Sequence, residues 1–364
     1  MNSSPIRVLI VDDSATVRKI LSDALRNAAG IEVVGTAPDP YVAREKILAL
    51  KPDVLTLDIE MPRMDGLTFL KKLMEYKPMP VIMISSLGQA SCHATMEAFR
   101  LGAVDVLAKP HGPYSVGDLA NTLADKVRSA AQANPRAFAP SRTSAVSASQ
   151  PAAGKAVASS LPAFASRRLI AIGASTGGPQ TIAHIVSQFP ADMPPVVITQ
   201  HMPPVFTAHF AERMKKTCMM DVKEAQDGDE LRPGRILIAP GDFHMTLQRS
   251  AAGARVRIAG GPLVCFSRPS VDVMFASVAQ TYAEQAIGVL LTGMGSDGAR
   301  GMLQMRQAGA TTIAQDEATS IVFGMPREAI RMGAATSVLP LDQIASNVLT
   351  QLTQQIARKN QHAR

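Results

Sequence analysis

Short β-rich runs alternate with helical patterns along most of this sequence, and this alternation constrains the fold more than any other feature. The first third of the chain contains five such runs: RVLIVDD (7–13), IEVVGTA (31–37), DVLTLDI (53–59), PVIMISS (80–86) and DVLAKP (105–110). Stretches such as TVRKILSDALRNA (16–28) and YVAREKILAL (41–50) have helical periodicity and separate them. Five strand–helix units predict a parallel sheet with helices on both faces.

The alternation stops between 129 and 166, where Ala, Ser and Pro dominate in a way typical of a flexible linker. A second series follows: RRLIAIGAS (167–175), PVVITQH (195–201), RILIAP (235–240), AIGVLLTG (286–293), TTIAQD (311–316) and TSVLP (336–340). We also expect a β-hairpin around Gly253. The chain of 364 residues is therefore predicted to form two doubly wound, parallel-sheet α/β domains, 5–128 and 167–357, joined by a linker over 129–166.

Charge and composition argue against several classes of protein. The net charge is +7, but five cations and no acid fall between 129 and 168, which favours a solvated basic linker and no nucleic-acid binding. The 3 cysteines lie far apart, which argues against a disulfide framework or a structural zinc site. No apolar run reaches the roughly 18 residues of a membrane helix, and the N-terminus does not resemble a secretory signal. We expect no membrane insertion and a cytoplasmic location.

Ionisable side chains end three predicted strands of the first domain. Asp12 and Asp13 end the first strand, and Asp58 ends the third. Lys109 ends the fifth. Carboxylates that converge at one sheet edge repel one another unless a cation neutralises them, and oxygen ligands favour Mg²⁺. We predict a Mg²⁺ site formed by these three aspartates. Asp58 is the expected phosphoryl acceptor, and Lys109 and Ser85 are expected to contact the phosphoryl oxygens. The alternative role, helix capping, is common for one such aspartate but does not account for the combination.

These residues belong to motifs with a known pattern. LIVDDS, LDIEMPRMDGL, MISS and LAKP resemble the receiver domain of response regulators, over residues 7 to about 125. The resemblance implies a flavodoxin-like fold, Mg²⁺ as a cofactor, and phosphorylation of Asp58 by a partner histidine kinase. In many receivers the position three before the lysine is aromatic and moves on activation. Here it is Val106, so we do not expect an aromatic switch.

The second domain opens with a glycine-rich turn, GASTGGP (173–179), directly after the apolar run LIAI. A P-loop requires GxxxxGK[ST], but Pro179 follows the last glycine. A dinucleotide-binding turn requires glycine where Ser175 stands. The turn does match G-x-S-x-G between a strand and a helix, which presents a serine hydroxyl for attack on a substrate. Ser175 is therefore the predicted nucleophile.

A serine nucleophile needs a general base, and the base needs an orienting group. His201 ends the next predicted strand and can reach Ser175 if the two strands are neighbours, about 4.8 Å apart. Asp297 follows the strand AIGVLLTG and is the candidate orienting group. Each residue alone also fits a structural role, such as a helix cap for Asp297, but the combination favours catalysis. No HExxH-like spacing links His201 with His209 and His244, which argues against a metallohydrolase.

The second domain also carries a family pattern. IGASTGGP, QHMPPVFTAHFAERM, APGDFHM, RPSVDVMF and LLTGMGSDGARGM resemble the catalytic domain of chemotaxis protein-glutamate methylesterases, over 168 to about 355. The resemblance implies a Rossmann-like esterase domain with no cofactor, in which Ser175 is the nucleophile, His201 the general base and acid, and Asp297 the orienting carboxylate. It implies hydrolysis of glutamate γ-methyl esters on the cytoplasmic helices of chemoreceptors, with release of methanol. Deamidation of receptor glutamines is the implied second activity.

Both reactions pass through a tetrahedral oxyanion, so one serine site can serve an ester and an amide. The expected donors to the oxyanion are the backbone N–H of Thr176, at the start of a helix, and that of Met294, before Asp297. The stretches MPPVFTAHF and APGDFHM are expected to line the approach of a receptor helix, although loop and core packing explains any single residue there equally well.

Two other classes of function remain open at this point. A response regulator with a DNA-binding output domain would need a helix-turn-helix or winged-helix module, and the repeated strands argue against it. A catalytically silent scaffold that binds receptors and kinase would have the same fold, so only activity separates it from an esterase. The linker is long enough for the receiver to dock beside the active site. We therefore expect that the receiver restrains the esterase and that phosphorylation activates it.

Overall fold

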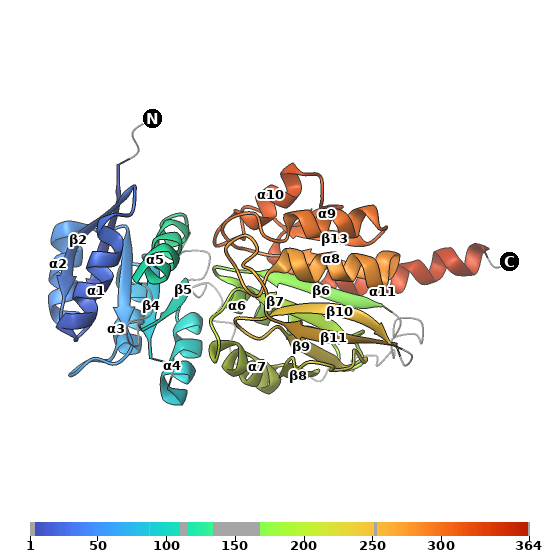
Figure 1. Cartoon of the computed structure of the whole chain (residues 1–364), viewed down its shortest axis with the longest axis horizontal. Helices are drawn as coiled ribbons and strands as arrows, with labels where there is room; N and C mark the ends of the chain where they lie inside the picture. The colour runs from blue at the N-terminus through green and yellow to red at the C-terminus, as the bar shows by residue number, and fades with distance from the viewer. Residues whose placement is uncertain (1–3, 87, 110–115, 134–167, 251–252, 363–364) are drawn as a thin grey trace.

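The computed structural model describes residues 4–86, 88–109, 116–133, 168–250 and 253–362. Two α/β domains lie side by side, the first in blue to teal in Figure 1 and the second in green to red. Each is built on a sheet whose described strand pairs are all parallel. The predicted fold class, two parallel-sheet α/β domains, is confirmed.

The first domain contains a five-stranded sheet in the order β2-β1-β3-β4-β5. Its elements are β1 (Ile6–Val11), α1 (Ala15–Arg26), β2 (Ile31–Ala37), α2 (Pro40–Leu50), β3 (Val54–Asp58), α3 (Gly66–Tyr76), β4 (Val81–Ser85), α4 (Gln89–Arg100), β5 (Asp105–Ala108) and α5 (Val116–Ala131). Side chains alternate between the faces of a strand. Leu9 and Leu55 therefore pack in a core with residues of α2, α3 and α4, whereas Val8 and Val54 pack with residues of α1 and α5. Strands β3 and β4 are buried along their whole length, which explains their continuous apolar runs.

The second domain contains a seven-stranded sheet in the order β14-β13-β12-β6-β7-β9-β8. Its elements are β6 (Leu169–Ala174), α6 (Gly178–Val186), β7 (Val196–Gln200), α7 (Phe206–Thr217), β8 (Asp221–Glu224), β9 (Arg235–Ile238), β10 (His244–Ser250), β11 (Gly253–Ala259), α8 (Val271–Tyr282), β12 (Ala286–Leu290), α9 (Ala299–Gln307), β13 (Thr311–Gln315), α10 (Met325–Arg331), β14 (Ser337–Leu339) and α11 (Leu341–His362). The strand order reverses between β6 and β12. Such a switch point opens a crevice at the carboxyl ends of the strands.

Some local features differ from the sequence prediction. The hairpin is present, with β10 and β11 paired antiparallel and Ser250 opposite Gly253. Strand β8 was not predicted, because its sequence DVKE has three charged residues and no apolar run; it pairs with β9 at the sheet edge. Helix α5 continues to Ala131, past the predicted start of the linker at 129, and α11 continues to His362, past the predicted domain end at 357. The remainder of the predicted linker, 134–166, lies outside the described residues.

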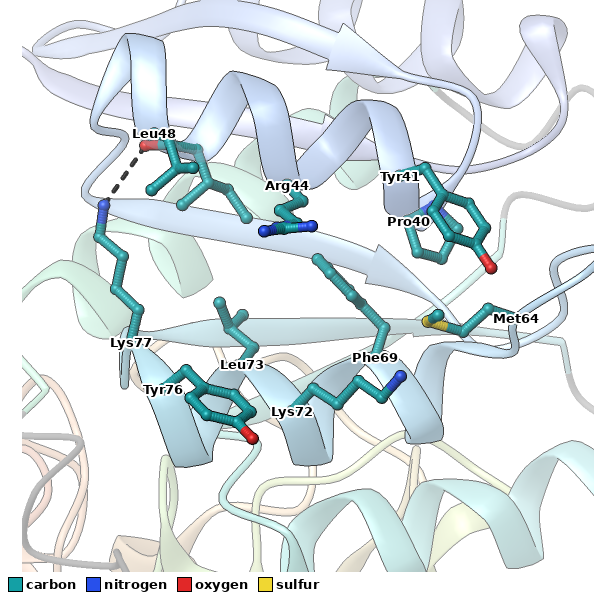
Figure 2. A pocket seen from close by; sticks show the side chains of 11 residues that line it. Pro40, Tyr41, Arg44, Leu48, Met64, Phe69, Lys72, Leu73, Tyr76 and Lys77 are labelled. Carbon is teal, nitrogen blue, oxygen red and sulfur yellow. Dashed lines mark hydrogen bonds between the residues drawn. The ribbon is translucent and has the colours of Figure 1, made fainter.

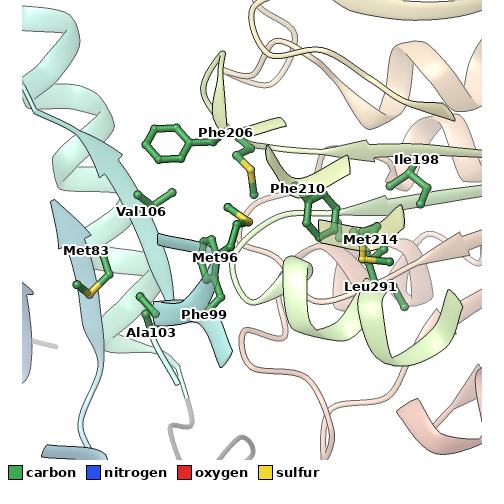
Figure 3. Packing of buried hydrophobic residues seen from close by; sticks show 14 of the residues in the cluster. Met83, Met96, Phe99, Ala103, Val106, Ile198, Phe206, Phe210, Met214 and Leu291 are labelled. Atoms are coloured by element: carbon green, nitrogen blue, oxygen red, sulfur yellow. The ribbon is translucent and has the colours of Figure 1, made fainter. Parts of the chain in front are cut away.

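The two domains pack together through buried apolar side chains. Figure 3 shows Met96 and Phe99 of α4 and Val106 of β5 on one side of the boundary, with Phe206 and Phe210 of α7 on the other. All five side chains are buried. Helix α4 contacts both α6 and α7. The side of the first domain formed by α4 and β5 therefore faces the second domain.

Helices α2 and α3 border an open groove of about 580 Å³ (Figure 2). Tyr41, Leu48 and Tyr76 are exposed at its walls, and Lys72 lies at its rim. The groove contains none of the predicted site residues, so it is not the candidate active site. In the described part of the chain, no helix combines the length and apolar character needed to cross a membrane.

Candidate active site

Ser175 lies in the tight turn between β6 and α6. Its amide donates to the carbonyl of Thr292, which follows β12 (3.0 Å), and its carbonyl accepts a hydrogen bond from Gln200 Nε2 at the end of β7 (2.8 Å). The turn is thus attached to both neighbouring strands. A Cβ on Gly178 would lie 1.9 Å from Gln200 Oε1, so close packing explains this glycine. Ser175 itself is partly exposed.

His201 follows β7, which pairs directly with β6 as the sequence argument required. Its amide donates to the Ala174 carbonyl, one residue before Ser175 (3.1 Å). Its ring Nε2 lies 2.7 Å from Asp297 Oδ2, and its Nδ1 lies 3.3 Å from Ser267 Oγ. Since Nε2 is engaged by the carboxylate, Nδ1 is the nitrogen left to accept a proton from a nucleophile. Within the described residues, no hydrogen bond joins the Ser175 hydroxyl to the ring.

Asp297 is 2% exposed and sits at the N-terminus of α8. Besides His201, its carboxylate accepts hydrogen bonds from the Ser270 hydroxyl (2.7 Å) and from the amides of Val271 (2.7 Å) and Asp272 (3.0 Å). The free N–H groups and the dipole of a helix start favour a carboxylate there. Burial alone would raise the pKa of Asp297, but the hydrogen bond and charge of His201 and these donors outweigh it and lower the pKa. The side chain therefore remains ionised beside the imidazole.

Two backbone amides near Ser175 have no hydrogen-bond partner in the described part of the chain: those of Thr176 and Met294. Thr176 follows Ser175 directly. Met294 follows Gly293, where an added Cβ would lie only 2.7 Å from the Ser175 Cβ. Neither predicted oxyanion donor is therefore engaged with another described residue.

The three histidines considered as metal ligands do not converge. His209 lies on α7, at the domain boundary. His244 Nδ1 accepts a hydrogen bond from the Ser270 amide (3.2 Å), and its Nε2 lies 2.9 Å from the Pro262 carbonyl oxygen. His244 thus helps to position Ser270, the hydroxyl donor to Asp297. Among the described residues, no group of potential metal ligands includes His201 or His244.

The acidic residues of the first domain do converge. Ligand oxygens of Asp12, Asp13 and Asp58 lie within 4.8 Å of one another. Lys109 Nζ is 2.7 Å from Asp58 Oδ2 and 3.6 Å from Asp12 Oδ2. Burial, opposed by the hydrogen bond from Lys109, raises the pKa of Asp58 from 3.8 to about 6, and burial also raises the pKa of Asp12. Asp12 Oδ2 is buried without a hydrogen-bond partner in the part of the chain described, so the donor set fits a hard divalent cation.

Ser85 and Val106 differ in how they relate to this acidic site. The Ser85 hydroxyl donates to the Ser91 carbonyl (3.3 Å) and accepts from Thr95 (3.0 Å), so it is engaged with α4 and not with Asp58. Val106 is buried in the apolar cluster at the domain boundary. The Ser85 hydroxyl thus connects β4 to α4, the helix that contacts α6 and α7 of the second domain.

Comparison with known proteins agrees with this geometry. Residues 170–348 match the family model described as CheB methylesterase, and 8–120 match the response regulator receiver domain. The chain is 51% identical over 346 residues to protein-glutamate methylesterase/protein-glutamine glutaminase 2 of Syntrophus aciditrophicus (strain SB), which covers 95% of this chain and 99% of that protein. Identity to the Escherichia coli (strain K12) protein-glutamate methylesterase/protein-glutamine glutaminase is 49% over 352 residues, 96% of this chain and 98% of that protein.

The chain belongs to the CheB methylesterase family. The crystal structure of the Thermotoga maritima CheB methylesterase catalytic domain matches with a TM-score of 0.50 and 39% identity, over 50% of this chain and 98% of that domain. The predicted family and enzyme class, a protein-glutamate methylesterase/protein-glutamine glutaminase with a receiver domain, are confirmed. A DNA-binding output domain is not favoured.

The receiver of this methylesterase packs directly on the serine turn. The Gly177 amide donates to the Val104 carbonyl of the receiver (3.2 Å). The Thr176 hydroxyl donates to Asp105 Oδ2 (3.0 Å) and accepts from Ser129 Oγ (2.8 Å). The residues immediately after Ser175 are thus buried against β5 and α5 of the receiver.

Several residues of the methylesterase site were missed by the sequence reasoning. Ser270 donates to Asp297, Gln200 holds the Ser175 carbonyl, and Ser267 lies beside His201. Ser270 precedes α8 as its N-cap, which is a recognisable sequence signal. No local pattern connects that cap to a carboxylate 27 positions later.

Proposed function

We propose that Ser175, His201 and Asp297 are the catalytic triad with which this methylesterase hydrolyses glutamate γ-methyl esters. The observation that carries the proposal is the 2.7 Å contact of the His201 ring with the buried carboxylate of Asp297, on the strand beside the G-x-S-x-G turn. In the first step, Ser175 Oγ attacks the ester carbonyl carbon while His201 Nδ1 takes the hydroxyl proton. Nε2–H stays bonded to Asp297, which stabilises the imidazolium.

The tetrahedral oxyanion then receives hydrogen bonds from the amides of Thr176 and Met294. When it collapses, the bond to the methoxy oxygen breaks, and His201 donates its proton to the departing methanol. A water molecule, deprotonated by His201, attacks the acyl-serine and releases the glutamate carboxylate and Ser175. With glutamine as substrate, the same steps release ammonia.

The substrates we propose are chemoreceptors, at side chains on their cytoplasmic helices. Curated relatives at about 50% identity over nearly the whole chain are named protein-glutamate methylesterase/protein-glutamine glutaminase, which supports this substrate class. A helical protein substrate also fits a serine that is partly exposed on a turn.

We further propose that phosphorylation of Asp58 by a chemotaxis histidine kinase activates the enzyme. Asp12, Asp13 and Asp58 would hold Mg²⁺, which when bound offsets the charge of the phosphoryl oxygens. Asp58 Oδ attacks the phosphorus of the phosphohistidine on the kinase, and the P–N bond breaks with its electron pair returning to the imidazole nitrogen. Lys109 contacts a phosphoryl oxygen, and Ser85 turns from α4 to contact another. Since Ser85 bonds to Ser91 and Thr95, that turn disturbs the helix that packs against the second domain. Undocking then exposes Thr176 and Gly177 to the substrate.

The test is methanol release from receptor-containing membranes methylated on glutamate, with mass spectrometry of the receptor to follow deamidation. Ser175→Ala should abolish both activities at an unchanged melting temperature, because a methyl group replaces a hydroxyl at a partly exposed turn. Ser187→Ala, an exposed serine beyond the end of the same helix, is the matched control and should retain full activity. Methanol release by Ser175→Ala at a rate near that of the control would refute the triad. A wild-type protein that released no methanol in this assay would favour the non-catalytic scaffold instead.

A further inference from the structure

Helices α4 and α7 bring three potential metal ligands together across the domain boundary. His93 lies on α4 of the receiver, and His209 and Glu212 lie one turn apart on α7 of the esterase domain. These two helices face each other in Figure 1. One ligand atom from each residue lies within 4.8 Å of the other two. The rings of His93 and His209 have centroids 5.0 Å apart and planes inclined by 65°.

His209 lacks a partner for one of its ring nitrogens. The residue is only 8% exposed, and its Nδ1 is buried without a hydrogen bond to any described residue. Glu212 Oε2 lies 3.5 Å from this nitrogen, too far for a good hydrogen bond. A buried polar atom without a partner is unfavourable, and native proteins rarely leave one in place. A cation held between His209, Glu212 and His93 would give this atom a partner.

The chemistry of the three ligands selects the ion. Two imidazoles and one carboxylate are the ligand set that suits Zn²⁺ and related divalent transition metals, with water at the fourth position. Mg²⁺ prefers oxygen ligands and would be a poor fit. Ligand atoms bound to one Zn²⁺ are closer together than the 4.8 Å limit within which these atoms lie, and small rotations of the His93 and Glu212 side chains can bring them to bonding distance. Both side chains are exposed and can rotate.

A hollow beside the three ligands gives an ion access to them, and the positive charges that line it lower the affinity for a cation. This hollow of about 290 Å³ is lined by His93, Met96, Glu97, Arg100, Arg213 and Lys216. Arg100 pairs with Glu97, and the Arg213 guanidinium donates to the Met96 carbonyl, so both cations have partners that hold them. Lys216 adds a further positive charge. We expect weaker binding than at a closed structural zinc site.

We propose that His93, His209 and Glu212 form a binding site for a divalent transition metal ion, of which Zn²⁺ is the best match, and that the bound ion joins the receiver to the esterase domain. The ligands come from both domains, so the ion binds the docked arrangement and stabilises it. By linkage, the factor by which the bound ion strengthens docking equals the factor by which separation of the domains weakens ion binding. This second statement rests on the activation mechanism proposed above, whereas the metal site itself does not.

The experiment uses the full chain, freed of metal by chelation. All variants carry Cys265→Ser, because Cys265, Asp272 and Asp297 are a second group of potential ligands, and millimolar Mg²⁺ is present to occupy the three receiver aspartates. Zn²⁺ binding is measured by titration calorimetry, and Co²⁺ is added separately to follow its visible absorption. We expect one ion per chain. His93→Gln changes an exposed side chain and should weaken binding by at least about tenfold, as should Glu212→Gln. His184→Gln, at a partly exposed histidine outside the cluster, should change nothing.

Absence of binding in the starting protein, or equal affinity in His93→Gln and His184→Gln, would overturn the metal site. A phosphodonor such as acetyl phosphate should lower the Zn²⁺ affinity of the full chain. Unchanged affinity, in protein whose methanol release the donor does stimulate, would overturn the bridging role. Failure of the donor to stimulate methanol release would count against the activation mechanism and not against the site.

Discussion

Gln180 on α6 gives the sharpest test of receiver docking, because its side chain crosses the domain boundary and takes no part in the proposed reaction. Its Nε2 donates to the carbonyls of Phe99 (2.8 Å) and Ala103 (2.9 Å) in the receiver. Gln180→Ala removes both bonds and leaves two carbonyls without these donors in the docked state. In the open state the same groups bind water, so the substitution destabilises docking and not the folded domains.

The expected magnitude follows from these two bonds. A neutral hydrogen bond contributes about 1 kcal/mol net, so Gln180→Ala should weaken docking by at most about 2 kcal/mol, or about 30-fold in the docking equilibrium. The substitution also removes Gln180 Oε1, which is buried without a hydrogen-bond partner among the described residues, and this offsets part of the loss. If the docked state dominates, methanol release without phosphodonor should rise by up to about 30-fold. The rate with saturating phosphodonor should not change, because most of the enzyme is then already open. The fold-stimulation of methanol release by phosphodonor should therefore decrease in Gln180→Ala.

The assay is initial methanol release at equal enzyme concentration, with and without acetyl phosphate. Gln188→Ala is the matched control, since Gln188 follows the same helix and donates within it, to the His184 carbonyl (2.8 Å). An unstimulated rate for Gln180→Ala equal to that of Gln188→Ala, in protein with an unchanged melting temperature, would refute the argument that these contacts restrain the esterase.

Three further predictions concern stability and the site. Burial raises the pKa of Asp58 from 3.8 to about 6, so the folded receiver favours the protonated carboxyl. The free energy of unfolding of the receiver should therefore fall by about 3 kcal/mol as the pH rises from about 4 to 6. Asp58→Asn should remove this pH dependence in Mg²⁺-free urea unfolding, and equal slopes in both proteins would contradict it. Ser270→Ala, which loses the bond to Asp297 and the cap of α8, should lower kcat more than KM changes and reduce stability by about 1 kcal/mol; unaltered kcat would exclude a positioning role. Gly178→Ala should displace Gln200 from the Ser175 carbonyl and lower methanol release at least about tenfold, whereas Gly260→Ala, with open space around it, should be neutral; equal activities would contradict the packing argument.

Local patterns in the sequence were sufficient for the element types and for most candidate residues. Alternating strand and helix periods predicted both parallel sheets, and a polar residue directly after an apolar run identified Asp58, Ser175 and His201 as strand-end residues. These inferences succeed because a buried strand and its end each produce a sequence pattern only a few residues long. The edge strand β8 has no such pattern, since an edge strand tolerates charged side chains.

Other properties depended on contacts between distant parts of the chain. Strand order placed β12 and β7 on either side of β6, and this order brings Asp297 to His201 across 96 positions. The start of α8 surrounds that carboxylate with donors and so lowers its pKa, which no local pattern near Asp297 indicates. Thr176 meets Asp105 across 71 positions, and His93 approaches His209 across the same boundary. The sequence by itself determined which residues stand at the ends of strands. Tertiary packing alone decided which of them meet, because strand order and domain docking are set by the summed burial of many side chains and not by any short segment.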